Sequence, residues 1–171
     1  MAKSKVSDTY ANKAYGDVVM SAANTMTFAQ ILFGVGLFEG KALLIHRASW
    51  YPTPTALREI VAATDTLQMA LTTSNRLSAI SDVSEPAIIC ARSIVGIAAN
   101  TEPFTRPMVD DFTGLPGGGL LVPANPIYIA AHTSGAAAAS EVRVEIRFSF
   151  LELSDSDYLE VLQSLFPANI A

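Results

Sequence analysis

The sequence is poor in charged residues. Only 16% of its 171 residues are Asp, Glu, Lys or Arg, whereas proteins on average contain about 25%. Half of the residues are hydrophobic, and the mean hydropathy is +0.34. So few charged side chains cannot cover the surface of a solitary domain. Either part of the chain enters a membrane, or apolar surface is buried between subunits.

Long apolar runs are also missing. A membrane-spanning helix needs about 20 apolar residues, but the best candidate, residues 25–38, is interrupted by Gln30 and two glycines. The run at 87–99 contains Arg92. The first residues, MAKSKVSDTYANK, are polar and have no apolar core after the lysines, which predicts no secretory signal. We therefore predict no transmembrane segment and favour burial of apolar surface between subunits.

Residues that carry chemistry are scarce. The one cysteine, Cys90, lies in an apolar run, which excludes a disulfide framework and predicts a buried small side chain. The two histidines, His46 and His132, have no Cys, His or carboxylate at a metal-ligand spacing. The glycine-rich LPGGGL at 115–120 lacks the GK[ST] ending of a phosphate-binding loop. We expect no metal, no cofactor and no enzymatic activity.

A basic region is missing as well. The net charge is −5, and the only local excess of positive charge is Lys3, Lys5 and Lys13. Proteins that bind nucleic acid usually carry a basic patch or arm, so we expect no strong direct binding of nucleic acid. Residues 1–16 are predicted to be a flexible tail, and residues 17–171 a single domain.

The clearest structural signal is a strand near the end of the chain. EVRVEIRFSFLEL, residues 141–153, alternates apolar with charged or polar residues at a period of two. This pattern places Ser149 and Leu151 on the polar face, which is expected to be solvated or to face a polar partner. Residues 127–133, IYIAAHT, predict a strand before it, and the small-residue turn between them predicts an antiparallel hairpin.

The remaining segments predict further strands. KALLIHRASWYPTPT, residues 41–55, is a strand stopped by two prolines. A short helix is predicted at 55–63, capped by Thr55. Strands are also predicted at 17–22, 25–35, 66–74 and 87–98, a long surface loop at 100–119, and a short C-terminal amphipathic helix after Ser154. The fold class is therefore all-β, an antiparallel β-sandwich or barrel.

Two segments, KALLIHRASWYP and LLVPANPIYIAAHTSGAAAASEVRVEIRFSFLEL, occur in the order of a known family. Over residues 17–153 the chain resembles viral major capsid proteins of the single jelly-roll type. The resemblance implies a jelly roll of about eight strands that assembles into an icosahedral shell without catalytic residues. It implies synthesis in the host cytoplasm and a place in the virion. The absence of an Arg-rich arm suits a shell lined by a membrane or a second coat protein.

The partners expected from this resemblance are copies of the chain itself. Three apolar regions outside the confident strands are candidate subunit contacts: residues 34–38, the 100–119 loop and the C-terminal helix. The candidate contact residues are Val35, Leu37, Phe38, Phe104, Phe112, Leu162, Leu165 and Phe166. The alternative is a glycan- or ligand-binding module, lectin-like or tail-fibre-like, that uses the 100–119 loop. A third possibility, a cupin-like enzyme, requires more histidines than the chain has.

Overall fold

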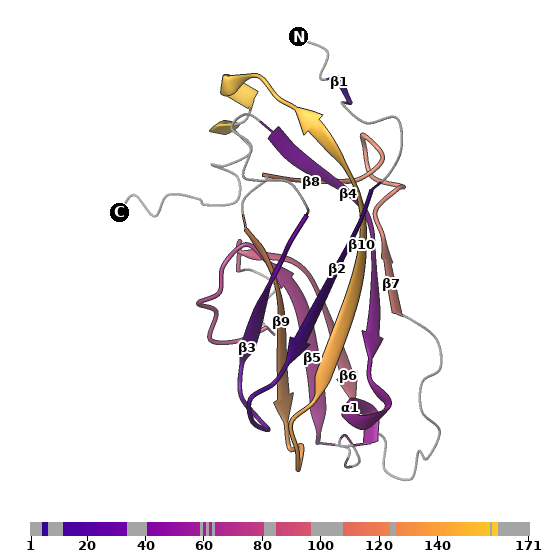
Figure 1. Ribbon diagram of the computed structural model, residues 1–171, viewed down its shortest axis with the longest axis vertical. Coiled ribbons are helices and arrows are strands. Elements are labelled where there is room, and N and C mark those ends of the chain that lie inside the picture. The colour runs from indigo at the N-terminus through magenta and orange to yellow at the C-terminus, as the bar shows by residue number, and fades with distance from the viewer. Residues whose placement is uncertain are drawn as a thin grey trace.

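The computed structural model describes residues 5–6, 12–33, 41–58, 60, 62, 64–80, 85–96, 108–123, 126–157 and 159–160. These residues form ten strands and one short helix, arranged as two antiparallel sheets (Figure 1). Sheet 1 contains β1 (Lys5–Val6), β2 (Asn12–Val19), β4 (Lys41–Pro52), β7 (Met108–Asp111), β8 (Leu120–Pro123) and β10 (Glu141–Glu152). Sheet 2 contains β3 (Thr27–Ile31), β5 (Thr66–Thr72), β6 (Ile88–Val95) and β9 (Ile127–Ser134). The expected antiparallel β-sandwich is confirmed.

The strand pairing is nested. In sheet 1, β10 lies between β2 and β4, and β4 pairs on its other side with β7 and β8. In sheet 2 the order is β3-β9-β5-β6. Each early strand therefore pairs with a late one: β2 with β10, β3 with β9, β4 with β7 and β8, and β5 with β6. Most connections along the chain cross from one sheet to the other.

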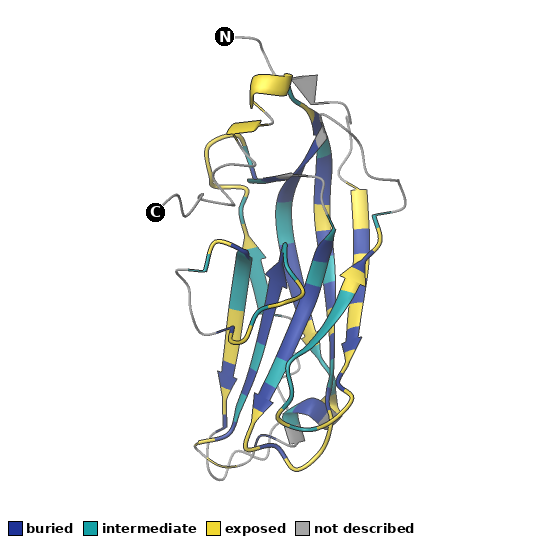
Figure 2. Cartoon of the chain, turned by 90° about the vertical axis from the view of Figure 1, so that its left-hand side faces the viewer, coloured by how far each residue is buried: buried dark blue, intermediate teal, exposed yellow. Residues whose placement is uncertain are grey.

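The core lies between the sheets and is built from the inward side chains of both. Along β10, Val142, Val144, Ile146 and Phe148 are buried while Arg143 and Arg147 are exposed, as the period of two predicts. The same alternation of buried and exposed residues is visible along the strands in Figure 2. The largest fully buried side chains include Trp50, Phe148, Leu43, Ile45, Leu67, Met69, Leu71, Ile127 and Ile129.

The connection after β9 differs from the predicted hairpin. Because β9 lies in sheet 2 and β10 in sheet 1, the segment between them crosses the sandwich. Asn24, in the β2–β3 connection, holds this crossing: its side-chain amide donates to the Ala136 carbonyl, and its Oδ1 accepts from the Ala136 N–H, both at 3.1 Å. The prediction of a hairpin was wrong because a small-residue turn permits either path.

Near its C-terminal end, the polar face of β10 is covered by His46 of β4. The alternation of apolar and polar residues in β10 does not reveal this contact. The register with β4 shifts between Arg147 and Phe148, which leaves His46 as an extra residue in β4. Its imidazole Nδ1 lies 2.8 Å from the Gly118 carbonyl, and its Nε2 lies 2.9 Å from Ser149 Oγ. Because a carbonyl only accepts, Nδ1 carries the proton and Nε2 accepts from the hydroxyl. Ser149 and Leu151 are both buried and not solvated, and Ser149 faces the polar side chain of His46.

Three further expectations need correction. Strand β2 begins at Asn12 and β1 occupies Lys5–Val6, so the tail does not extend over 1–16. The helix α1 covers Pro54–Arg58 and is capped by Thr53, whose Oγ1 accepts from the Ala56 N–H at 3.2 Å, and not by Thr55. The 100–119 segment is not one loop, because β7 lies inside it.

The C-terminal helix begins where it was expected, and the rest of the predicted helix lies outside the described residues. Residues 155–157 and 159–160 are helical and directly follow β10. The Asp157 N–H donates to Ser154 Oγ at 3.3 Å, so Ser154 is the cap. None of the helices in the described part of the chain is long and apolar enough to cross a membrane.

Candidate interaction surfaces

The outer face of sheet 1 carries charges of both signs in cross-strand rows. One row runs from Asp17 through Arg143 to Tyr51, and the next from Tyr15 through Glu145 to Ser49. We call this surface the charged face; its members on β2, β4 and β10 are Lys13, Tyr15, Asp17, Val19, Arg47, Ser49, Tyr51, Glu141, Arg143, Glu145 and Arg147. Basic and acidic side chains alternate across it, so it is not a uniformly basic surface.

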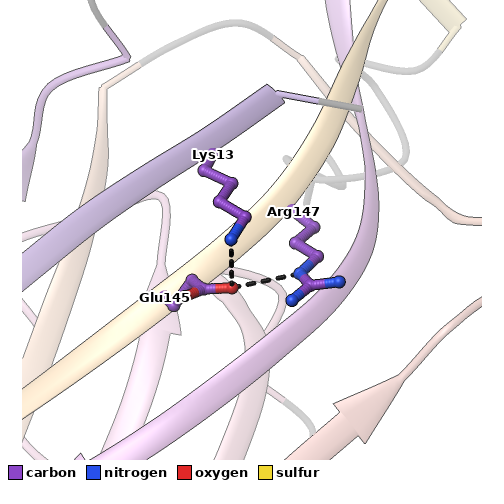
Figure 3. A network of polar contacts seen from close by, with 3 residues as sticks. All are labelled: Lys13, Glu145 and Arg147. Atoms are coloured by element: carbon purple, nitrogen blue, oxygen red, sulfur yellow. Dashed lines mark hydrogen bonds and ion pairs between the residues drawn. The ribbon is translucent and has the colours of Figure 1, made fainter. Parts of the chain in front are cut away.

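Glu145 is the centre of a small ionic network on the charged face (Figure 3). Its Oε1 accepts from Arg147 Nε at 3.0 Å and lies 3.8 Å from Lys13 Nζ. The hydrogen bond from Arg147 holds the pKa of Glu145 below its ordinary value, and the charge of Lys13 acts in the same direction. This stabilisation is present above the ordinary glutamate pKa and is lost as the pH falls. Ion pairs at a surface contribute roughly 0–1 kcal/mol each.

Large apolar side chains lie exposed among these charges. Tyr15 and Val19 on β2 are 65% and 64% exposed, and Tyr51 on β4 is 42% exposed. Leu32, Val95, Leu115 and Leu159 are also exposed elsewhere. Aromatic residues are enriched in protein–protein interfaces, whose fully buried centre is apolar and whose rim is polar. The exposed tyrosines of the charged face are therefore candidates for contact with another protein surface.

The outer face of sheet 2 has the opposite character. None of the side chains of β3, β5, β6 and β9 that point away from the core is Asp, Glu, Lys or Arg; we call this the uncharged face. Its central row is Phe28, Ala130, Ala70 and Ala91. Ile80, from the connection between β5 and β6, is buried against Ala70 and Ala130 and covers this centre. The uncharged face is thus partly covered by the chain itself.

A shallow hollow of about 440 Å³ opens at the end of β2 and β10. It is lined by Val19, Thr53, Ala139, Ser140 and Glu141. The Ser140 hydroxyl is buried and has no hydrogen-bond partner in the described part of the chain.

The residues selected from the sequence as subunit contacts fall mostly outside the described residues. Those are Val35, Leu37, Phe38, Phe104, Leu162, Leu165 and Phe166. Phe112 is described: it is half-buried, packs against the core, and its N–H donates to the His46 carbonyl at 2.9 Å. These contacts remain predictions. The exposed residues of β2 were missed, although Tyr15, Asp17 and Val19 follow a period of two.

The side chains able to carry chemistry lie apart. Both ring nitrogens of His46 are engaged, and His132 lies on the uncharged face. Over the described ranges, no three His, Cys, Asp or Glu side chains are grouped so as to hold a metal ion. Arg92 of β6 pairs with the Asp110 carboxylate of β7 at 2.5 Å and donates to the Val109 carbonyl at 3.1 Å. Asp110 also accepts from Trp50 Nε1 at 2.8 Å, so this cluster joins the two sheets.

Cys90 is expected to be chemically inert in the folded protein. Burial raises the pKa of its thiol to about 12, and the nearby Asp110 carboxylate acts in the same direction. The reactive thiolate is therefore nearly absent at pH 8. We expect a disulfide reagent such as DTNB to label the native protein at least tenfold more slowly than the protein in guanidinium chloride. Equal rates in the two conditions would contradict this assignment.

The fold and its surfaces define an antiparallel β-sandwich with one charged and one uncharged outer face. Among solved structures, the chain is similar to a chain of tomato aspermy virus, determined by X-ray crystallography. The likeness covers 81% of this chain and 76% of that chain, with 8% sequence identity and a TM-score of 0.46. No family model and no curated protein matches the sequence. A likeness at this level carries no assignment of function, which has to come from the chain's own surfaces.

Proposed function

We propose that this chain is a structural subunit that assembles with copies of itself into a closed shell, as a viral coat protein does. The observation that carries the proposal is the exposure of large apolar side chains on a sandwich with nested strand pairing. The nested pairing of β2 with β10 and β3 with β9 supports a jelly roll as part of this proposal, the double-sheet architecture of capsid, lectin and cupin domains.

The exposed surfaces favour a coat protein over a lectin-like binding module or a cupin-like enzyme. A lectin or a cupin needs a localised site, whereas the apolar exposed residues here are spread over several elements: Tyr15, Val19, Leu32, Tyr51, Val95, Leu115 and Leu159. Several contacts around one subunit are what closure of a shell requires, because each copy must touch more than one neighbour. The proposed role is structural and involves no catalysis.

In this role the protein belongs to the virion, and its main partners are copies of itself. We expect weak direct binding of nucleic acid, because acidic side chains accompany the basic ones on the charged face. A second coat protein in the same shell would be detected by mass spectrometry of purified particles.

The test is the state of the purified full-length protein. We expect multi-angle light scattering to give a mass of many subunits, and negative-stain microscopy to show particles of one or a few discrete diameters. Discrete diameters distinguish assembly from aggregation, which gives a continuous range of sizes. A monodisperse monomer at high concentration would contradict the proposed function.

A further inference from the structure

Strand β2 forms an edge of sheet 1 that lacks most of the usual protection against pairing. Of the described strands, only β10 pairs with it (Figure 1). Natural proteins block exposed edges with short strands, charged side chains such as lysine, prolines, bulges or inward charges; of these devices β2 has only the outward charges of Lys13 and Asp17. Strand β2 has eight residues, no proline, no register shift against β10, and only Ala14, Gly16 and Val18 pointing inward.

The other edges are protected. Strand β3 has five residues, and β7 and β8 have four each. Strand β6 has eight residues, but its register against β5 shifts, and Arg92 bridges from it to β7. Among the described strands, β2 is therefore the one edge strand of eight residues without a proline, a register shift or an inward charge.

The outward residues of β2 are complementary to themselves. Lys13, Tyr15 and Asp17 lie on the charged face at a spacing of two. In an antiparallel pair of two β2 strands centred on Tyr15, each Lys13 stands opposite Asp17 of the second copy. A shift of the centre to residue 13 or 17 would place two lysines or two aspartates opposite each other, which is destabilising. The charges therefore favour the centre at residue 15 over centres at residues 13 and 17, and only the centre at residue 15 places both lysines opposite aspartates.

We infer that two copies of this chain pair edge to edge through β2, in a two-fold contact with Tyr15 opposite Tyr15, which continues sheet 1 across both subunits. On the outer side, the contact joins two tyrosines and two Lys–Asp pairs. On the inner side, Ala14 of one copy meets Gly16 of the other, and small side chains let the backbones approach. The inference deepens the proposed function and rests on it, because it names one contact within the assembly.

The decisive experiment compares two cysteine variants, Tyr15→Cys and Val19→Cys. Both positions are on β2, face the same side and are equally exposed. Directly opposite residues have Cβ atoms about 4.5–5.5 Å apart, which small shifts bring within the reach of a disulfide. The two copies of residue 19 would be roughly 26 Å apart along the pair, from a rise of about 3.3 Å per residue. Cys90 can remain, because its buried thiol has a raised pKa.

We expect Tyr15→Cys to give at least tenfold more disulfide-linked dimer than Val19→Cys on a non-reducing gel after mild oxidation. Equal amounts, or none from either variant, would overturn the inference. If particles of discrete size form without the Tyr15→Cys dimer, the two-fold contact is wrong and the proposed function stands. If the dimer forms but no particles do, the contact stands and the proposed function is wrong.

A charge exchange tests the register independently. Lys13→Asp and Asp17→Lys each create like charges across the contact, so each is expected to reduce dimer cross-linking of Tyr15→Cys at least threefold. The double exchange recreates opposite pairs and is expected to restore cross-linking. In Lys13→Asp, the new carboxylate also repels Glu145 within its own subunit. The double variant keeps this repulsion, so restored cross-linking reports the contact between copies. No restoration would contradict the proposed register.

Discussion

Trp50→Ala is expected to lower the free energy of unfolding by about 3–5 kcal/mol, the range for removing a large buried aromatic residue. Trp50 is completely buried in β4, and its Nε1–H donates to the Asp110 carboxylate at 2.8 Å. The variant leaves a cavity between the sheets and removes one partner of the half-buried Asp110 carboxylate. Urea denaturation followed by circular dichroism measures the change, since Trp50 is the single tryptophan and fluorescence would be lost.

The neighbouring residue provides the control. Tyr51 is aromatic, follows Trp50 in the same strand and points to the charged face, where it is 42% exposed. Tyr51→Ala is expected to change the free energy of unfolding by less than about 1 kcal/mol. Both variants must be compared in the same oligomeric state, because association adds to apparent stability. If Trp50→Ala and Tyr51→Ala lowered the free energy of unfolding by the same amount, Trp50 would not be central to the core.

The elements predicted most accurately are the long strands with one apolar face. In β10, buried Val142, Val144 and Ile146 alternate with residues of the charged face, and the burial follows that alternation. The reason is physical: a strand buried on one face must repeat every two residues. Strand β5 was predicted from the same alternation, β4 and β9 were also predicted as strands, and the two prolines after Trp50 correctly indicated where β4 ends.

Strand β2 was placed partly in a tail because its inward residues are small. Ala14 and Gly16 give almost no hydrophobic signal, and Lys13 and Asp17 on the other face are charged. The structure explains why small residues stand here: a Cβ on Gly16 would lie 2.7 Å from Ile31 Cγ1, so the close approach of β2 and β3 leaves no room. Strand β2 does repeat every two residues, but small residues, and not large apolar ones, alternate there with polar residues.

Contacts between distant segments were not predictable from local patterns. Whether β9 and β10 form a hairpin depends on the pairing of each with other strands, which a turn of small residues does not determine. The same holds for Arg92 and Asp110, which join the two sheets although a single sequence gives no reason to pair them. For the charged face, the alternation along residues 141–153 indicated the charged side chains of β10 but not which side chains of β2 are exposed.

Gly135→Ala is expected to lower the free energy of unfolding by about 2–4 kcal/mol, through backbone strain and overlap together. Gly135 has a φ of 81°, which side chains with a Cβ rarely adopt, and an added Cβ would overlap the carboxylate of Asp65. Asp65 is buried, and its Oδ2 accepts from the Ala62 N–H at 2.7 Å. Displacing this carboxylate would disturb the turn that leads into β5.

Gly117→Ala separates the two causes of that loss. Gly117 has a similar φ of 89°, but nothing lies within 4 Å of the position of an added Cβ. Its replacement should therefore show the backbone strain alone, about 1 kcal/mol. The difference between the two variants, measured by urea denaturation, reports the contact of residue 135 with Asp65. If the two losses are the same, the carboxylate of Asp65 moves away without penalty, and the crossing between the sheets is less rigid than its packing indicates.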